Sequence, residues 1–162
     1  MKAAILMGSK NDYPVVQKAE EIFKEFGIDC ETRIISAHRT PKVAEAFAKT
    51  AEERGVEVII AAAGKAAHLG GVLAATTALP VIGLPMKSST MDGLDSLLSV
   101  VQMPKGIPVA TVAIDGAENA ALLAVQIMGV KYPELRAAFK KYKEKMANDI
   151  IAQDEEFQKN KA

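Results

Sequence analysis

Short runs of almost continuous apolar residues recur along the chain, and they constrain its fold more than any other feature. The clearest lie at residues 3–7, 56–63 and 109–114. A run of this length that ends at glycine or polar residues is typical of a strand buried on both faces of a parallel sheet. We predict two further strands, at residues 30–35 and 80–84.

Segments with helical spacing separate these strands. Helices are expected at residues 14–26, 41–54, 70–77, 93–102 and 117–128. In the second, we expect the apolar residues Val43, Ala44, Phe47 and Ala51 to point inward. Strands that alternate with helices, without hairpin signals, predict an α/β fold with three layers around a five-stranded parallel sheet. By analogy with doubly wound folds, we expect the strand order 2-1-3-4-5.

The last segment differs from the rest of the chain. Residues 133–157 form one long helical pattern, which would extend over roughly 38 Å. A helix of that length is expected to pack on a neighbouring subunit, the alternative being that it lies back across its own sheet. The length of 162 residues nevertheless favours a single domain over residues 1–162.

Charge and cysteine content limit the classes of function. The chain has 20 basic and 20 acidic residues, so no overall field attracts nucleic acid or an anionic membrane. Cys30 is the only cysteine, which excludes an intrachain disulfide and fits a reducing cytoplasm. We see neither a signal peptide nor the ~20 apolar residues of a membrane span. A cytoplasmic protein that binds neither nucleic acid nor membrane is therefore expected.

Three turns that follow strands contain most of the polar residues suited to chemistry. They are residues 8–12, 36–40 and 64–71, here called the first, second and third turns. In a parallel sheet all three lie at the carboxyl edge, where ligands bind. The helices after them would point their N-terminal amides at the same crevice, which favours an anion.

The residue types in these turns suggest a phosphorylated sugar. Ser9 offers a hydroxyl beside the amides, and the guanidinium of Arg39 suits a phosphate. Asp12 would repel a phosphate but can accept hydrogen bonds from sugar hydroxyls, so a ribonucleotide is the simplest ligand. The alternatives are that Ser9 and Asp12 only cap helices, and that Arg39 pairs with a surface carboxylate. Neither the dinucleotide-binding nor the nucleoside-triphosphatase glycine fingerprint is present.

The two histidines of the chain, His38 and His68, both fall in these turns. An imidazole titrates near neutrality and can shuttle a proton, although a histidine can also serve structure alone. Two histidines without a cluster of cysteines or carboxylates are poor evidence for a metal site. Cys30 lies at the opposite edge, so no nucleophilic triad is predicted.

Five blocks of sequence occur in order over essentially the whole chain. They are Gly8-Ser9-Lys10-Asn11-Asp12, Ser36-Ala37-His38-Arg39-Thr40-Pro41, Ala67-His68-Leu69, residues 102–109 and residues 119–124. Any one of these blocks alone would be a weak signal, but together they resemble the PurE proteins of de novo purine synthesis.

The resemblance implies a flavodoxin-like sheet and a homo-octamer in which C-terminal helices embrace neighbouring subunits. Class I members are N5-carboxyaminoimidazole ribonucleotide (N5-CAIR) mutases, which move a carboxylate from the exocyclic nitrogen to ring carbon C4. They need no ATP, metal or organic cofactor. Class II members carboxylate aminoimidazole ribonucleotide (AIR) directly with carbon dioxide. A third reading, a non-catalytic phosphosugar-binding module, would need Ser9, Asp12 and Arg39 but not His38.

Carried over by position, the resemblance implies that Ser9 and Arg39 hold the phosphate, Asp12 the ribose hydroxyls, and that His38 shuttles the proton. It adds further substrate-binding residues: Ser36, Gly64, Lys65 and His68. The class I pattern after the third strand usually reads Gly-Gly-Ala-Ala-His-Leu-Pro-Gly, and here Lys65 and Gly70 depart from it. We expect Lys65 to steady the migrating carboxylate, and the loops at 85–92 and 103–108 to cover the pocket.

Overall fold

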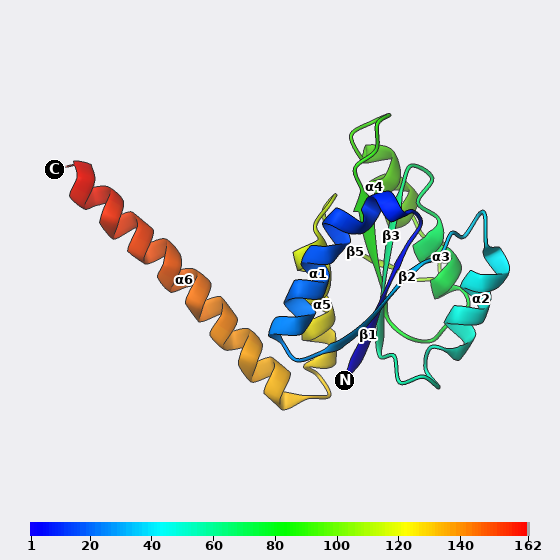
Figure 1. Ribbon diagram of the computed structural model, residues 1–162, viewed down its shortest axis with the longest axis horizontal. Helices are drawn as coiled ribbons and strands as arrows, with labels where there is room; N and C mark the ends of the chain where they lie inside the picture. The colour runs from blue at the N-terminus through cyan, green and yellow to red at the C-terminus, as the bar shows by residue number, and fades with distance from the viewer. Residues whose placement is uncertain (162) are drawn as a thin grey trace. The chain divides into compact units, whose positions relative to one another are not determined.

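The computed structural model describes residues 1–161, and its centre is a parallel sheet of five strands (Figure 1). The strand order is β2-β1-β3-β4-β5, with every neighbouring pair parallel, so the predicted fold class and order are confirmed. The strands are β1 (Lys2–Met7), β2 (Asp29–Ile34), β3 (Val58–Gly64), β4 (Val81–Met86) and β5 (Ala110–Thr111).

The three inner strands are buried on both faces, as their apolar sequences predict. All residues of β4 are buried, as are all of β3 except Gly64 at its end. The register aligns Ile5 of β1 with Ile60 of β3, and Ile60 with Ile82 of β4. Because apolar side chains meet across the sheet on both faces, the carboxyl ends of these strands are held rigidly side by side.

Helices cover the two faces of the sheet. A short 3-10 helix, η1 (Lys10–Asp12), leads into α1, which lies on the opposite side of the sheet from α2 and α3 (Figure 1). Phe47 of α2, Leu73 of α3 and Val100 of α4 pack with residues of β1 and β3 in one apolar cluster. The helices are α1 (Tyr13–Glu25), α2 (Pro41–Thr50), α3 (Leu69–Ala74), α4 (Leu94–Val101), α5 (Ala117–Met128) and α6 (Pro133–Lys161).

Some predicted details are wrong. The α2 helix ends at Thr50 rather than at residue 54, and the chain continues in turns to Gly55. Val43 is 46% exposed, whereas Ala44, Phe47 and Ala51 are buried as expected. The fifth strand pairs with β4 over two residues only, whereas β2, at the other side of the sheet, pairs with β1 over its whole length.

The chain divides into two compact units, residues 1–124 with the sheet and a second unit from residue 125 onward. The second unit contains the long helix α6, whose 29 residues extend for roughly 44 Å. Leu135 is buried, whereas Met146, Ile150 and Phe157 are exposed. The single domain and the role of this helix in assembly stay predictions. In residues 1–161 no helix is both long and apolar enough to span a membrane.

Candidate active site at the carboxyl edge of the sheet

The three turns meet at the carboxyl edge of the sheet and surround one cavity of about 620 Å³. β1, β2 and β3 are neighbours in the sheet, so the turns that follow them lie next to one another. The loop after β4 closes a further side. The cavity is lined by Gly8, Ser9, Asn11, Asp12, Ser36, Ala37, His38, Arg39, Ala63, Gly64, Lys65, Ala66, Leu69, Lys87, Ser88 and Ser89.

The first turn is closed by a hydrogen bond that its own serine accepts. Oγ of Ser9 accepts from the backbone N–H of Asn11 at 3.2 Å and so caps η1. The capping alternative is therefore realised for Ser9, but the hydroxyl also faces the cavity and its O–H can still donate. Asp12 occupies the N-cap position of α1 without any hydrogen bond from its side chain to the helix.

The carboxyl group of Asp12 is half-buried in the wall of the cavity. Burial raises the pKa of Asp12, and the nearby charge of Asp115 adds to the rise, against a backbone hydrogen bond from Ser9 that lowers it. A desolvated carboxylate that lacks a cation gains from any donor that enters the cavity. Sugar hydroxyls are donors of that kind.

The second turn is held by hydrogen bonds among its own side chains. Oγ of Ser36 accepts from the backbone N–H of Arg39 at 3.2 Å and from its Nε at 3.4 Å. Oγ1 of Thr40 donates to the carbonyl of Ser36 at 2.9 Å and accepts from its N–H at 3.0 Å. Thr40 therefore stands at the N-cap of α2 but uses its hydroxyl to close the turn instead of capping the helix.

The guanidinium of Arg39 connects the second turn to the first. Its Nη2 donates to the carbonyl oxygen of Gly8 at 2.7 Å. Nη1 has no hydrogen-bond partner among the residues that the structure describes, so part of the guanidinium fork remains available at the cavity wall. No carboxylate pairs with Arg39 in residues 1–161, which disfavours the surface ion pair.

The imidazoles of the second and third turns touch each other. Nε2 of His38 lies 3.0 Å from Nδ1 of His68, and the rings meet edge to face. His38 lines the cavity, but His68 does not. The structure thus brings the two histidines together while leaving only His38 at the cavity wall.

The third turn contains an unusual backbone conformation at Lys65. Its φ of 55° lies in the left-handed region, which a lysine rarely adopts. The carbonyl of Lys65 accepts a hydrogen bond of 3.4 Å from Oγ of Ser99 in α4. Gly70 packs near Val100 and Val109, where an added Cβ would lie 3.4 Å from each and make ordinary contacts.

The loop after β4 contributes residues that sequence reasoning named only as a segment. Lys87, Ser88 and Ser89 line the cavity, whereas the loop at 103–108 does not. The backbone N–H of Lys87 donates to Oδ1 of Asp115 at 2.8 Å, which ties this loop to the chain after β5. Lys87 follows a strand, as Ser9 and His38 do. Its position after a strand was the sequence signal that could have predicted it as a cavity residue.

Cys30 lies within β2, away from the cavity. Burial raises the pKa of its thiol to about 11, although a contact with the hydroxyl of Thr32 acts in the opposite direction. A thiol that stays protonated at neutral pH is a poor nucleophile. This agrees with the expectation that Cys30 belongs to no nucleophilic triad.

A parallel α/β fold with an imidazole, a guanidinium and a half-buried carboxylate around one cavity suits an enzyme that acts on a small anionic molecule. The family model described as AIR carboxylase matches residues 2–149. The chain belongs to this family.

Two relatives that are similar over most of both chains are mutases. The N5-carboxyaminoimidazole ribonucleotide mutase of Saccharolobus solfataricus is 60% identical over 93% of this chain and 96% of its own length. That of Mycobacterium tuberculosis is 51% identical over 98% of this chain and 91% of its own length. The chain is therefore an enzyme with the activity of a mutase, an isomerase.

The fold agrees with a solved structure of the family. The crystal structure of Treponema denticola PurE superposes with a TM-score of 0.85 at 32% identity, covering 96% of this chain and 97% of that one. The likeness extends over the whole described fold, as the PurE resemblance in the sequence predicts.

Proposed function

We propose that the chain converts N5-CAIR into 4-carboxy-5-aminoimidazole ribonucleotide (CAIR) in purine biosynthesis. The observation that supports this most directly is that Ser9, Asp12, His38 and Arg39 surround one cavity. The similarity to mutases at 51–60% identity supports the same reaction.

The phosphate binds between the first and second turns. The guanidinium of Arg39 connects both turns through its bond to Gly8, and Oγ of the neighbouring Ser9 can also donate. Two donors of this kind suit a dianion, with charge-assisted bonds from the guanidinium. Asp12 then accepts from the ribose hydroxyls, which replace the water lost on burial.

His38 gives one proton to the substrate and later takes one back. Cleavage of the bond between the exocyclic nitrogen and the carboxylate releases carbon dioxide, and the nitrogen gains a proton from His38. Ring carbon C4 then attacks the carbon dioxide and forms the new carbon–carbon bond. The C4 proton returns to His38, so the enzyme ends each turnover in its starting state.

Lys65 holds the carboxylate while it migrates. Lys65 lines the cavity, and its left-handed backbone conformation costs free energy. Residues with strained backbones of this kind cluster at ligand sites. No carboxylate pairs with Lys65 in the part of the chain that the structure describes. Its ammonium is thus free to bind an incoming anion.

The role of Lys65 is tested by comparing two ligands that differ only in the carboxylate. Lys65→Ala should weaken binding of CAIR by roughly 10-fold, the worth of one charge-assisted hydrogen bond, and leave binding of AIR unchanged. Titration calorimetry measures both. An equal loss for the two ligands would refute carboxylate recognition by Lys65.

The reaction itself is tested by offering the enzyme both substrates. We expect the enzyme to convert N5-CAIR to CAIR without bicarbonate. The change in absorbance measures this conversion. Direct carboxylation is the second candidate, because the chain is 49% identical to part of a chloroplastic phosphoribosylaminoimidazole carboxylase of Vigna aconitifolia, over 96% of this chain and 28% of that protein. Turnover of AIR with bicarbonate, and none of N5-CAIR, would establish that candidate instead.

The remaining properties follow from the family resemblance. The enzyme acts in the cytoplasm on a small ribonucleotide, without ATP, metal or organic cofactor. It assembles as a homo-octamer through α6, whose exposed Ile150, Ile151 and Phe157 offer apolar contacts. Light scattering should give eight times the mass of 17.3 kDa; a monomer would disprove the assembly.

A further inference from the structure

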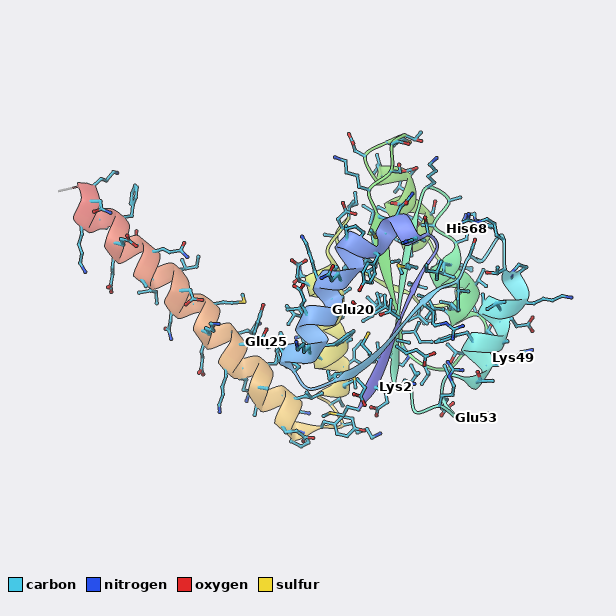
Figure 2. The ribbon with its side chains drawn as sticks, viewed as in Figure 1. Lys2, Glu20, Glu25, Lys49, Glu53 and His68 are labelled. Atoms are coloured by element: carbon cyan, nitrogen blue, oxygen red, sulfur yellow. The ribbon has the colours of Figure 1, made fainter. Side chains whose placement is uncertain are left out.

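His68 belongs to the third turn, yet its side chain lies outside the wall of the cavity, against His38. Figure 2 labels His68 just before α3, next to the loop that precedes α2. We propose that His68 is a positioning residue: its Nδ1 holds Nε2 of His38, so that His38 exchanges protons with the substrate through Nδ1. This inference rests on the proposed function and assigns His68 a role other than substrate binding.

The geometry allows one hydrogen between the two rings. The facing nitrogens are 3.0 Å apart, the ring centroids 5.1 Å apart, and the ring planes are at 83°. In a neutral imidazole one nitrogen donates and the other accepts. If both facing nitrogens bore hydrogen, two N–H groups would point at each other. One ring therefore donates and the other accepts, which couples their tautomers.

The outer nitrogens of the pair are not equivalent. Within residues 1–161, neither Nδ1 of His38 nor Nε2 of His68 has a hydrogen-bond partner in the protein. His38 lines the cavity and His68 does not. The nitrogen that can reach a substrate is therefore Nδ1 of His38. To remove a proton it must have a free lone pair, which requires the hydrogen of neutral His38 to be on Nε2.

The proposed role of His68 is to favour that tautomer by acting as the acceptor. When Nε2 of His38 bears the hydrogen, it donates to the lone pair on Nδ1 of His68. After His38 takes the C4 proton at Nδ1, its ring is a cation and the same bond becomes charge-assisted. The hydrogen bond weakens when the exocyclic nitrogen takes the proton of His38, and it strengthens again as the C4 proton arrives. An interaction that strengthens toward the transition state of this second transfer raises kcat more than it lowers KM.

The backbone around His68 suits a positioning role. Its N–H donates to the carbonyl of Ala66 at 2.8 Å, and its neighbours Ala67 and Leu69 are 1% and 2% exposed. The chain is thus anchored on both sides of a ring that is itself exposed. A substitution at this position can remove the imidazole without disturbing the core.

Three variants of the full-length enzyme test the proposal. His68→Ala removes the acceptor and should lower kcat by about 10- to 100-fold, as expected for a hydrogen bond to a charged group, with KM changed less than two-fold. His68→Asn places a carboxamide oxygen near the position of Nδ1 and should recover most of the loss. His68→Phe fills the space without an acceptor and should be as slow as the alanine variant.

A spectroscopic measurement tests the tautomer without turnover. In ¹⁵N-labelled enzyme above neutral pH, His38 should show Nε2 with the shift of a protonated nitrogen and Nδ1 with that of a bare one. In the His68→Ala variant the two signals should move toward the averaged values of a free imidazole.

Three results would overturn the proposal: full kcat in His68→Ala, a loss that appears in KM alone, or no recovery in His68→Asn. A hydrogen on Nδ1 of neutral His38 would do the same. Failure of the proposed function is seen separately, as a wild-type enzyme that does not convert N5-CAIR. The tautomer measurement still decides the histidine contact in that case.

Discussion

The second and third turns both present a histidine at the same edge of the sheet, but different forces hold them. In the second turn, Ser36 and Thr40 form hydrogen bonds that close the loop on itself, and no residue has a positive φ. In the third turn, Lys65 has a left-handed backbone, and a hydroxyl of α4 supports its carbonyl. One turn is held by its own polar side chains, whereas the other is strained and is supported by a neighbouring helix.

This difference separates two kinds of contribution to activity. A turn closed by its own hydrogen bonds places Arg39 and His38 before the substrate arrives, which reduces the reorganisation needed during reaction. A strained turn lowers the free energy of unfolding in exchange for the position of one side chain. Substitutions in the second turn should therefore change rate and affinity, and those in the third turn should also change stability.

The largest effect is expected at His38. His38→Asn removes the titratable group and should lower kcat by about 10³-fold, within the usual range for general acid–base catalysis. Binding of CAIR, measured by calorimetry, should change little because Ser9, Asp12 and Arg39 remain. A variant that keeps its turnover would point to the non-catalytic binding module.

Arg39 should affect affinity more than rate. Arg39→Ala removes the guanidinium and its bond to Gly8, and should raise KM by about 10- to 100-fold through lost charge-assisted bonds. Arg39→Lys keeps the charge but loses the two-pronged guanidinium, so its KM should lie between those of the wild-type enzyme and the alanine variant. Steady-state kinetics would contradict this if KM were unchanged in the alanine variant.

In the third turn, a substitution that relieves the backbone strain should increase stability. Lys65→Gly relieves a left-handed conformation and should raise the free energy of unfolding by about 1 kcal/mol, measured by urea denaturation. Lys65→Ala keeps the strain and is the matched control. If the glycine variant were no more stable than the alanine variant, strain would not distinguish the two turns.

The smallest effect concerns the pH dependence of stability in the first turn. Because the pKa of Asp12 is raised in the folded protein, the folded state binds this proton more tightly than the unfolded chain does. Stability should therefore fall as pH rises through the interval between the two pKa values, and Asp12→Asn should remove that part of the fall. Thermal melts of both proteins across the acidic range test it; identical pH dependence would show that Asp12 is not the cause.

The sheet could be predicted because apolar runs and helical spacing dominate its sequence. The runs at 3–7 and 56–63 correspond to β1 and β3, whose burial on both faces leaves little alternative. The run at 109–114 is just as apolar, but only Ala110–Thr111 pairs with β4. Pairing at the edge of a sheet depends on one neighbour and on the local path of the chain, which hydrophobicity does not encode.

Which residues reach the cavity edge could also be predicted, but not their contacts. The strand ends place Ser9, His38 and Lys65 together once the sheet order is known. The bond between His38 and His68 joins residues 30 apart in sequence and depends on the rotamers of both rings. The positive φ of Lys65 contradicts the backbone preference of its residue type, so no propensity argument predicts it.

The position of β1 has a practical consequence for attaching the enzyme to a solid support. The six residues of β1 cross the sheet from the amino ends of its strands to the carboxyl ends, where Gly8 follows, a distance of roughly 20 Å (Figure 1). A linker coupled at residue 1, which is 40% exposed, would thus be joined to residues 1–124 on the edge away from the cavity. Immobilised through residue 1, the unit of residues 1–124 would keep its cavity directed toward the solution.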